Sequence, residues 1–138
     1  MAKARVLIVE DDTLTALDVK DALIAAGYEV CGMAESEAEA LALADAAPPD
    51  FAVVDIALSP GDGRTVARML SQRHGTEVLF ATGQCDEVSR LTRSGALACL
   101  PKPYDAEDVP TALEAIANIS CGKPPGRMPD HMFALNAV

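Results

Sequence analysis

The chain has 138 residues, of which 50% are hydrophobic, and its 11 basic and 21 acidic side chains give a net charge of −10. This length fits one domain with a full core, and so acidic a domain is not expected to bind nucleic acid, because phosphate contacts need Lys and Arg. No apolar run approaches the roughly 20 residues of a membrane span, and the first one stops at Glu10, too early for a signal peptide. We therefore expect a cytoplasmic protein whose partners include neither nucleic acid nor a membrane.

Short apolar runs alternate with helical stretches over residues 1–119, a pattern typical of β-α units around a parallel sheet. The apolar runs predict strands over residues 6–9, 28–33, 51–54, 77–81 and 96–100. Helices are predicted over residues 13–26, 35–47, 64–73, 86–93 and from an N-cap at Asp105 to about Asn118. The sequence thus predicts one three-layer α/β domain with five strands and five helices.

Residues 120–138 differ in composition from this domain. Prolines at positions 124, 125 and 129 exclude a regular element before Pro129, and an apolar stretch follows over residues 132–135. We expect this segment to be a flexible or loosely docked tail. It leaves no room for a second, output domain, so the sequence favours a stand-alone module.

Four cysteines occur in the chain, and none has the spacing of a zinc ligand set. In a reducing compartment, Cys31, Cys85, Cys99 and Cys121 are expected to be single thiols. Three of them lie in or beside predicted strands, which indicates small buried side chains.

Polar residues directly follow four of the predicted strands. Glu10-Asp11-Asp12 follows the first strand, Asp55 the third, Thr82 the fourth and Lys102-Pro103 the fifth. Because residues just past the carboxyl ends of parallel strands converge on one crevice, these side chains are expected to share a pocket.

The predicted pocket has the chemistry of a divalent-cation and phosphoryl site. Asp11 and Asp55 would repel each other unless a cation lay between them, and oxygen ligands favour Mg²⁺. Glu10 is expected to hold a metal-bound water, and Asp12 to lie at the rim. Each residue alone would more often be a solvated strand end, but their coincidence at successive strand ends argues against that interpretation.

Asp55 is the candidate phosphoryl acceptor, because a carboxylate can attack phosphorus to form an acyl phosphate. The transition state spreads negative charge over three oxygens. A metal ion, the Lys102 ammonium, and the Thr82 hydroxyl with the Gly83 amide would each stabilise one of them.

Four short motifs occur in order along the chain: Val-Glu10-Asp11-Asp12, Val-Asp55-Ile-Ala-Leu, Ala-Thr82-Gly and Pro-Lys102-Pro. Together they resemble the receiver domain of bacterial two-component response regulators over about residues 4–119. The resemblance implies a doubly wound, flavodoxin-like domain with five parallel strands in the order 2-1-3-4-5.

The resemblance also implies roles for the pocket residues. Asp55 would accept a phosphoryl group from a phosphohistidine on a sensor histidine kinase or phosphotransfer protein. Asp11, Asp55 and the carbonyl of Ala57 would bind Mg²⁺ directly, and Glu10 through water. Thr82 would hydrogen-bond the phosphoryl group and Lys102 would pair with it. The Lys102-Pro103 peptide bond would be cis.

Two positions depart from the usual family pattern. Receivers commonly carry Tyr or Phe three residues before the lysine, where this chain has Cys99. The run Phe80-Ala-Thr-Gly is similar to the signature of a subgroup of single-domain receivers from alphaproteobacteria, which ends in an aromatic residue where this chain has Cys85. The usual coupling between threonine and aromatic residue cannot operate here.

The resemblance implies a phosphoacceptor, not an enzyme with a separate substrate, that promotes its own phosphorylation and dephosphorylation. It would signal to a downstream protein through altered contacts, or act as a phosphate sink. A pseudo-receiver, a binding module unaffected by phosphorylation, is the alternative that Cys99 keeps open. A phosphohydrolase with a nucleophilic Asp55 would need a second Asp at position 57, where the chain has Ala57.

Overall fold

The computed structural model describes residues 4–85 and 95–135, and strands and helices alternate along them. The elements are β1 (Arg5–Val9), α1 (Thr13–Ala25), β2 (Glu29–Ala34), α2 (Glu37–Ala46), β3 (Phe51–Val54), α3 (Gly63–His74), β4 (Glu77–Thr82), β5 (Ala96–Pro101), α5 (Asp108–Ser120) and β6 (Phe133–Ala134). The predicted helix over residues 86–93 lies outside the described residues.

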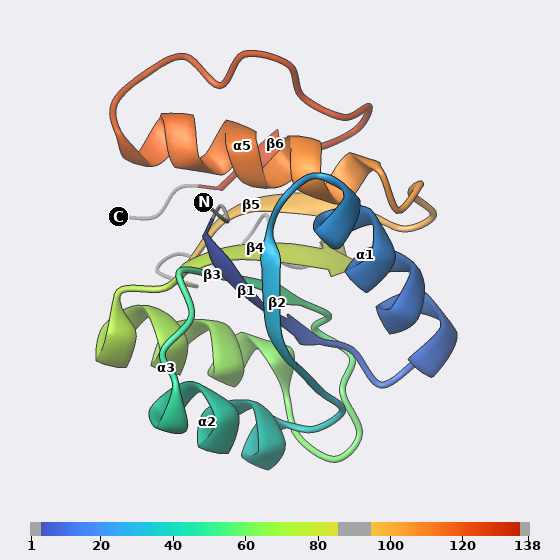
Figure 1. The fold of residues 1–138 in the computed structure, drawn as a ribbon, viewed down its shortest axis with the longest axis vertical. Helices are drawn as coiled ribbons and strands as arrows, with labels where there is room; N and C mark the ends of the chain where they lie inside the picture. The colour runs from blue at the N-terminus through green and yellow to red at the C-terminus, as the bar shows by residue number, and fades with distance from the viewer. Residues whose placement is uncertain (1–3, 86–94, 136–138) are drawn as a thin grey trace.

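The strands form one sheet in the order β2-β1-β3-β4-β5-β6. All neighbouring strands are parallel except β6, which pairs antiparallel with β5. Helices α1 and α5 cover one face of the sheet, and α2 and α3 cover the other (Figure 1). The predicted doubly wound α/β fold and the strand order 2-1-3-4-5 are therefore confirmed, with a sixth strand added at the β5 edge.

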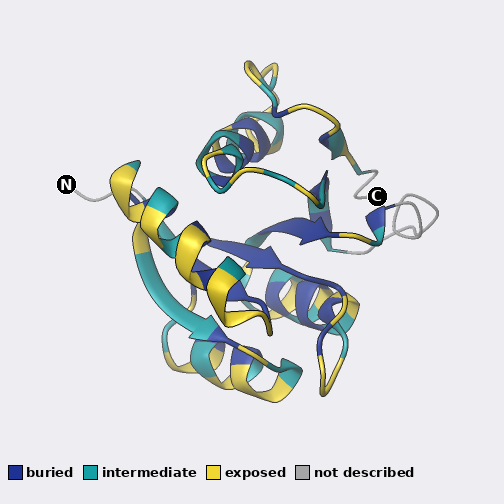
Figure 2. Cartoon of the chain, turned by 90° about the vertical axis from the view of Figure 1, so that its right-hand side faces the viewer, coloured by how far each residue is buried: buried dark blue, intermediate teal, exposed yellow. Residues whose placement is uncertain are grey.

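The alternation of side chains along each strand builds the two cores. In β1, Val6 and Ile8 join the cluster under α1 and α5, whereas Leu7 and Val9 join the cluster under α2 and α3. The central strands are buried on both faces, as parallel strands between helix layers must be, while β2 at the edge is half-buried (Figure 2).

Helix starts follow the capping rules at three of the four described helices. Asp12, Ser36 and Asp62 each accept a hydrogen bond from a backbone amide in the first turn of α1, α2 and α3. The predicted N-cap at Asp105 is wrong, because the chain first makes a turn in which the Asp105 carbonyl accepts from the Asp108 amide at 2.9 Å. Helix α5 begins only after this turn.

The prediction of four single thiols is wrong for one pair, since Cys85 and Cys99 form a disulfide. Cys99 lies opposite Phe80 in the β4–β5 register, and the chain turns back after β4. This turn brings the two Cα atoms to 6.0 Å, within the range of a disulfide. Cys31 and Cys121 are free thiols.

The described part of the tail runs back along the domain and adds β6 to the sheet. Phe133 pairs with Cys99, and the Leu135 amide donates to the Leu97 carbonyl at 2.8 Å. Met132, just before the strand, is 8% exposed and belongs to the core under α1 and α5. Residues up to 135 are therefore docked on the domain. Among the described residues, no helix is both long enough and apolar enough to cross a membrane.

Candidate functional site

The sheet brings the predicted polar residues to one edge. Glu10 and Asp11 directly follow β1, Asp55 follows β3, Thr82 ends β4 and Lys102 follows β5. Val9 is in register with Val54, so the residues that come next, Glu10 and Asp55, emerge side by side.

Backbone hydrogen bonds continue the sheet past its last strand residues and fix these positions. The Asp55 amide donates to the Val9 carbonyl at 2.9 Å, and the Lys102 amide donates to the Thr82 carbonyl at 3.0 Å. Gly63, the first residue of α3, packs against the backbone of Asp55 so closely that a Cβ atom there would collide with the Asp55 carbonyl oxygen. Backbone hydrogen bonds from the sheet and close packing against the start of α3 therefore fix the position of Asp55.

Lys102 joins the two buried carboxylates. Its Nζ donates to Asp55 Oδ2 at 2.8 Å and lies 3.3 Å from both carboxylate oxygens of Glu10. Asp55 is 5% exposed and Glu10 6%, whereas the Lys102 side chain is 32% exposed. The ammonium therefore neutralises part of a buried negative charge and still reaches solvent.

The environment separates the pKa values of the two carboxyl groups. Burial alone would raise the pKa of Asp55, but hydrogen bonds from Lys102 and Thr82 stabilise its carboxylate and bring the pKa below its ordinary value. Burial and the neighbouring Asp55 charge raise the pKa of Glu10 to about 7, although Lys102 acts in the opposite direction. The lowered pKa keeps Asp55 in its carboxylate form.

The pKa of Lys102 reflects the same contacts. Burial disfavours its ammonium form, but the hydrogen bond and charge of Asp55, together with Glu10, outweigh burial and raise the pKa above its ordinary value. Lys102 therefore remains a cation beside the Asp55 carboxylate.

Thr82 is fully buried beneath the crevice and hydrogen-bonds the Asp55 carboxylate. Its Oγ1 also accepts a hydrogen bond from the Gln84 amide at 3.3 Å, within the turn that leaves β4. Gly83 lies on the exposed part of that turn. The structure therefore places the predicted hydroxyl next to the predicted acceptor.

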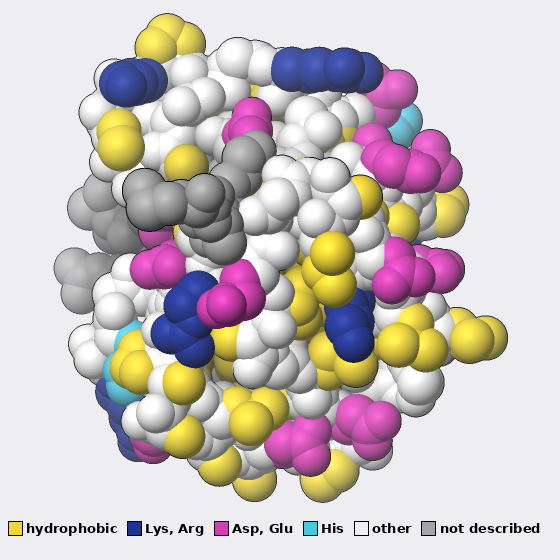
Figure 3. All heavy atoms as spheres, viewed as in Figure 1, with side chains coloured by type: hydrophobic (Ala, Val, Ile, Leu, Met, Phe, Trp, Pro, Cys, Tyr) yellow, Lys and Arg dark blue, Asp and Glu magenta, His cyan; other side chains and the backbone are white. Residues whose placement is uncertain are grey.

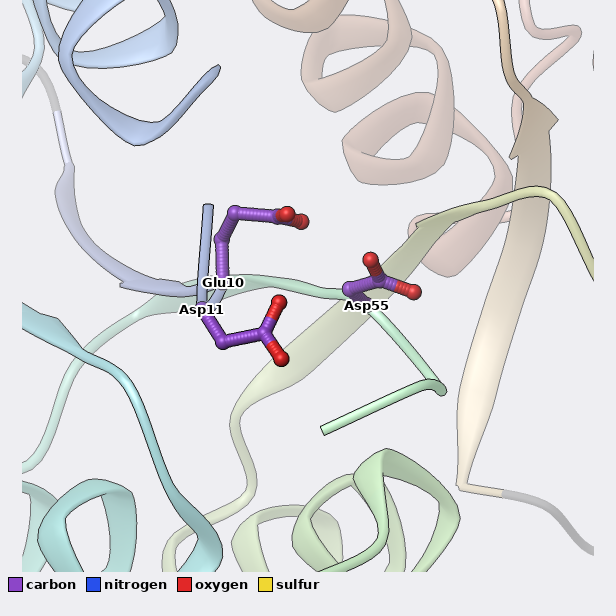
Figure 4. A group of neighbouring side chains, drawn as sticks. All are labelled: Glu10, Asp11 and Asp55. Atoms are coloured by element: carbon purple, nitrogen blue, oxygen red, sulfur yellow. The ribbon is translucent and has the colours of Figure 1, made fainter. Parts of the chain in front are cut away.

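Three carboxylates form an acidic group in the crevice. Glu10, Asp11 and Asp55 each offer an oxygen atom, and these oxygens lie within 4.8 Å of one another. The side chains of Glu10 and Asp11 extend from the end of β1 toward Asp55 at the end of β3 (Figure 4). Clustered oxygen donors with unbalanced negative charge suit a hard divalent cation, so these residues fit Mg²⁺.

The remaining predicted positions lie around this group. Ala57 is exposed, and its amide donates to Asp55 Oδ1 at 3.0 Å, so it lies next to the Asp55 carboxylate. Asp12 caps α1 through the Leu14 amide at 3.1 Å and accepts from the Thr15 hydroxyl at 3.0 Å. Asp12 therefore faces the helix at the rim, as the sequence predicted.

The sequence did not predict the contact of Lys102 with Glu10 or the position of Tyr104. Burial raises the pKa of the Tyr104 phenol to about 12, so it stays neutral beside the crevice. A hollow of about 430 Å³ opens between α1 and the segment after β5, lined by Thr15, Asp18, Val19, Lys102, Pro103, Tyr104 and Ala106. No local sequence pattern signals this hollow, because two distant segments form it.

Residues 6–114 match the family model of the response regulator receiver domain. The transcriptional regulatory protein PdtaR of Mycobacterium tuberculosis is 36% identical over 112 residues, which cover 80% of this chain and 55% of PdtaR. The chemotaxis protein CheY of Bacillus subtilis is 30% identical over 117 residues, which cover 83% of this chain and 98% of CheY. The chain thus spans about half the length of PdtaR and nearly all of CheY.

Solved structures show the same architecture. A CheY-like receiver domain protein from Methanospirillum hungatei superposes with a TM-score of 0.74 at 27% identity, covering 88% of this chain and 99% of that one. The receiver domain of PhyR from Erythrobacter litoralis superposes with a TM-score of 0.75, covering 85% of this chain and 92% of that one. At 21% identity, the PhyR comparison supports the fold alone.

Proposed function

This chain belongs to the response regulator receiver family, and from that premise we propose that Asp55 accepts a phosphoryl group and thereby switches the contacts of the domain with other proteins. The observation that supports this most strongly is the position of Asp55, a buried carboxylate with lowered pKa that contacts the Lys102 ammonium at 2.8 Å. A nucleophile, a cation and a hydroxyl therefore meet where an acyl phosphate would form.

Three residues of the chain would each have a separate role in the phosphoryl transfer. A carboxylate oxygen of Asp55 attacks phosphorus, and the bond between phosphorus and the donor's imidazole nitrogen breaks. The leaving imidazole takes a proton from solvent. Lys102 moves from the carboxylates onto a phosphoryl oxygen, and the Thr82 hydroxyl donates to another. Because both groups already surround Asp55, little reorganisation is needed to stabilise the charge that develops.

The acidic group explains why we propose a Mg²⁺-dependent step. Asp11, Asp55 and the Ala57 carbonyl would bind the ion directly, and Glu10 through water. When bound, Mg²⁺ would neutralise charge on the phosphoryl oxygens and on the carboxylates. The raised pKa of Glu10 indicates the cost of keeping these carboxylates ionised together without a cation.

Apolar side chains on α1 favour a protein as the phosphoryl donor. Leu14 is 75% exposed, Ile24 51% and Leu17 39%, and hydrophobic side chains alternate with acidic ones on the right of Figure 3. Leu14 lies in the first turn of α1, three positions after Asp11 of the acidic group. We propose that a histidine kinase or phosphotransfer protein covers this surface when it brings its phosphohistidine to Asp55.

We further propose that the protein works in the cytoplasm as a stand-alone phosphoacceptor. It would promote its own phosphorylation and dephosphorylation and convert no separate substrate. The output would be an altered contact with a downstream protein, or removal of phosphoryl groups from a shared kinase.

The test is incubation with Mg²⁺ and acetyl phosphate, followed by intact mass spectrometry. Wild type should gain the mass of one phosphoryl group, and Asp55→Asn should gain none. Asp12→Asn is the matched control, because asparagine caps a helix as well as aspartate does, so this variant should behave as wild type. A gain that persists in Asp55→Asn would show that another residue is the acceptor.

A second donor separates the remaining alternatives. Leu14→Ala should slow transfer from a cognate phosphohistidine kinase and leave the reaction with acetyl phosphate unchanged, because only the protein donor contacts α1. If neither donor phosphorylates the wild type, the chain is a binding module regulated by contact alone.

A further inference from the structure

The disulfide between Cys85 and Cys99 joins the two segments that carry Thr82 and Lys102. Cys85 lies three residues after Thr82, and Cys99 lies three residues before Lys102. The Cα atoms of the two cysteines are 6.0 Å apart, although 14 positions separate them in the sequence. The bond therefore fixes the turn after β4 to the middle of β5, next to the crevice.

Contacts within this turn connect the disulfide to Thr82. Cys85 Sγ lies 3.7 Å from the Thr82 carbonyl oxygen, which also accepts the hydrogen bond from the Lys102 amide at 3.0 Å. The Gln84 amide donates to Thr82 Oγ1 at 3.3 Å. A covalent anchor so close to Thr82 limits how far its hydroxyl can move relative to Lys102.

The surroundings of the two sulfur atoms are apolar. Cys85 is 4% exposed and Cys99 is fully buried, between Phe80 on β4 and Phe133 on β6. Both cysteines belong to the core under α2 and α3. Two thiols would fit this environment as small apolar side chains, so the packing does not require the bond. In cytosolic proteins disulfides are rare and usually transient. They form and break by thiol–disulfide exchange.

We propose that Cys85 and Cys99 are a reversible dithiol–disulfide pair whose state sets how fast Asp55 is phosphorylated, an inference that rests on the proposed function. The oxidant is a low-molecular-weight disulfide such as oxidised glutathione. The Cys85 thiolate attacks one glutathione sulfur and releases one glutathione thiolate; the Cys99 thiolate then attacks Cys85 Sγ and releases the second. One protein disulfide forms, one glutathione disulfide is reduced, and the two cysteine protons pass to the two glutathione molecules.

The direction of the effect follows from the contacts of Thr82. In the disulfide form the turn is held with the Thr82 hydroxyl against Asp55, in position for a phosphoryl oxygen. In the dithiol form packing alone holds the turn, so the turn moves away from Lys102 more readily and the hydroxyl must be brought back before transfer. Because small misplacements of a positioning group slow a reaction strongly, reduction should lower the phosphorylation rate by about 10-fold.

Reversibility is tested on the full chain by counting thiols. The native protein is equilibrated in mixtures of reduced and oxidised glutathione, quenched with acid, then unfolded in denaturant, alkylated and weighed, so that buried thiols are counted as well. The oxidised form should take up alkyl groups only at Cys31 and Cys121, and the reduced form at all four cysteines. A graded conversion between these masses is expected; a protein that keeps the same thiol count across all mixtures overturns the proposal.

The regulatory effect is tested by phosphorylation with acetyl phosphate and Mg²⁺ before and after reduction by a phosphine. The double variant Cys85→Ser/Cys99→Ser should react at the reduced rate in both conditions, whereas Cys31→Ser/Cys121→Ser should keep the response of wild type. Because reduced wild type is itself the comparison, the outcome does not depend on the folding of a variant.

Equal rates in the oxidised and reduced wild type would overturn the regulatory effect. Absence of phosphorylation in both states would contradict the proposed function, and with it the regulatory effect. Thiol counting would still decide, in that case, whether the cysteine pair is reversible.

Discussion

The crevice and the β5 edge of the sheet differ in the interactions that stabilise them. In the crevice, one ammonium contacts the buried carboxylates of both Asp55 and Glu10 and neutralises part of their charge. At the β5 edge, the Cys85–Cys99 disulfide and the pairing of β5 with β6 join segments that carry no charge at their contacts.

Because of this difference, the contacts in the crevice can rearrange, whereas the β5 edge resists or transmits that rearrangement. The crevice has an excess of negative charge, so a bound cation would relieve repulsion there, and added phosphoryl charge would redistribute the contacts of Lys102. The β5 edge has a covalent bond and strand pairing, which move only when they are broken. Substitutions in the crevice should therefore act mainly on the phosphorylation rate. Substitutions at the edge should lower stability, and those that open the disulfide should also slow phosphorylation.

Replacing the central cation should have the largest effect. Lys102→Met keeps the length of the side chain but leaves two buried carboxylates without their partner, and the phosphorylation rate should fall about 100-fold. Phosphorylation by acetyl phosphate, followed by intact mass over time, measures this rate. Lys123→Met removes an exposed lysine from the tail and should have no effect. An unchanged rate in Lys102→Met would remove the cation from the proposed chemistry.

Opening the disulfide should lower stability without affecting the acidic group. Cys85→Ser removes a cross-link that closes a loop of 14 residues, and the free energy of unfolding should fall by about 3 kcal/mol. Urea denaturation measures this loss, with the exposed Cys121→Ser as the control. Added Mg²⁺ should raise the Tm of Cys85→Ser as much as that of wild type, because the substitution leaves the carboxylates unchanged. Equal stability of the two variants would contradict the role given to the bond.

Truncating Met132, the buried side chain of the tail, tests whether the docked tail stabilises the β5 edge. Met132 is 8% exposed, so Met132→Ala should lower the free energy of unfolding by about 2 kcal/mol. Leu14→Ala removes a side chain that is 75% exposed and should change it by less than about 0.5 kcal/mol. If Met132→Ala were as stable as Leu14→Ala, the tail would contribute nothing to the fold in solution.

A substitution in the crevice is expected to raise the free energy of unfolding by a smaller amount. The pKa of Glu10 is raised from 4.5 to about 7, so between these pH values the unfolded chain releases a proton that the folded chain keeps. The contribution of Glu10 to stability therefore falls as the pH rises through this window. Glu10→Gln, which cannot ionise, should exceed wild type in stability by about 1 kcal/mol at pH 8 without divalent cations.

Urea denaturation of Glu10→Gln and wild type at pH 5 and pH 8 measures this difference, with the exposed Glu35→Gln as the control. Added Mg²⁺ should stabilise wild type more than Glu10→Gln, because the variant lacks one carboxylate of the acidic group. A difference that does not change with pH would contradict the raised pKa of Glu10.

The crevice could be predicted from the sequence because its signals are local. Each polar residue directly follows an apolar run, and the carboxyl ends of parallel strands meet at one edge whatever the rest of the chain does. The cis Lys102-Pro103 bond, implied by the family resemblance, is confirmed. The ion pair between Lys102 and Glu10 was not predicted, since it depends on how two side chains from opposite ends of the chain meet.

The β5 edge could not be predicted in the same way. The pairing of Cys85 with Cys99 depends on a turn whose path local pattern does not specify, and the expectation of a reducing compartment argued against it. The strand β6 has only two residues, Phe133 and Ala134, and exists because β5 offers an unpaired edge. Such features arise from tertiary contacts, which propensity and periodicity do not record.

The most direct test of the phosphoacceptor assignment is to locate the phosphoryl group. An acyl phosphate formed with Mg²⁺ and acetyl phosphate can be reduced by borohydride, which converts the modified aspartate to homoserine, and the peptide that contains it can be sequenced by mass spectrometry. Homoserine at position 55, and at none of the other aspartates, is the result that the proposed function predicts. Homoserine at Asp11 or Asp12 in place of Asp55 would contradict it.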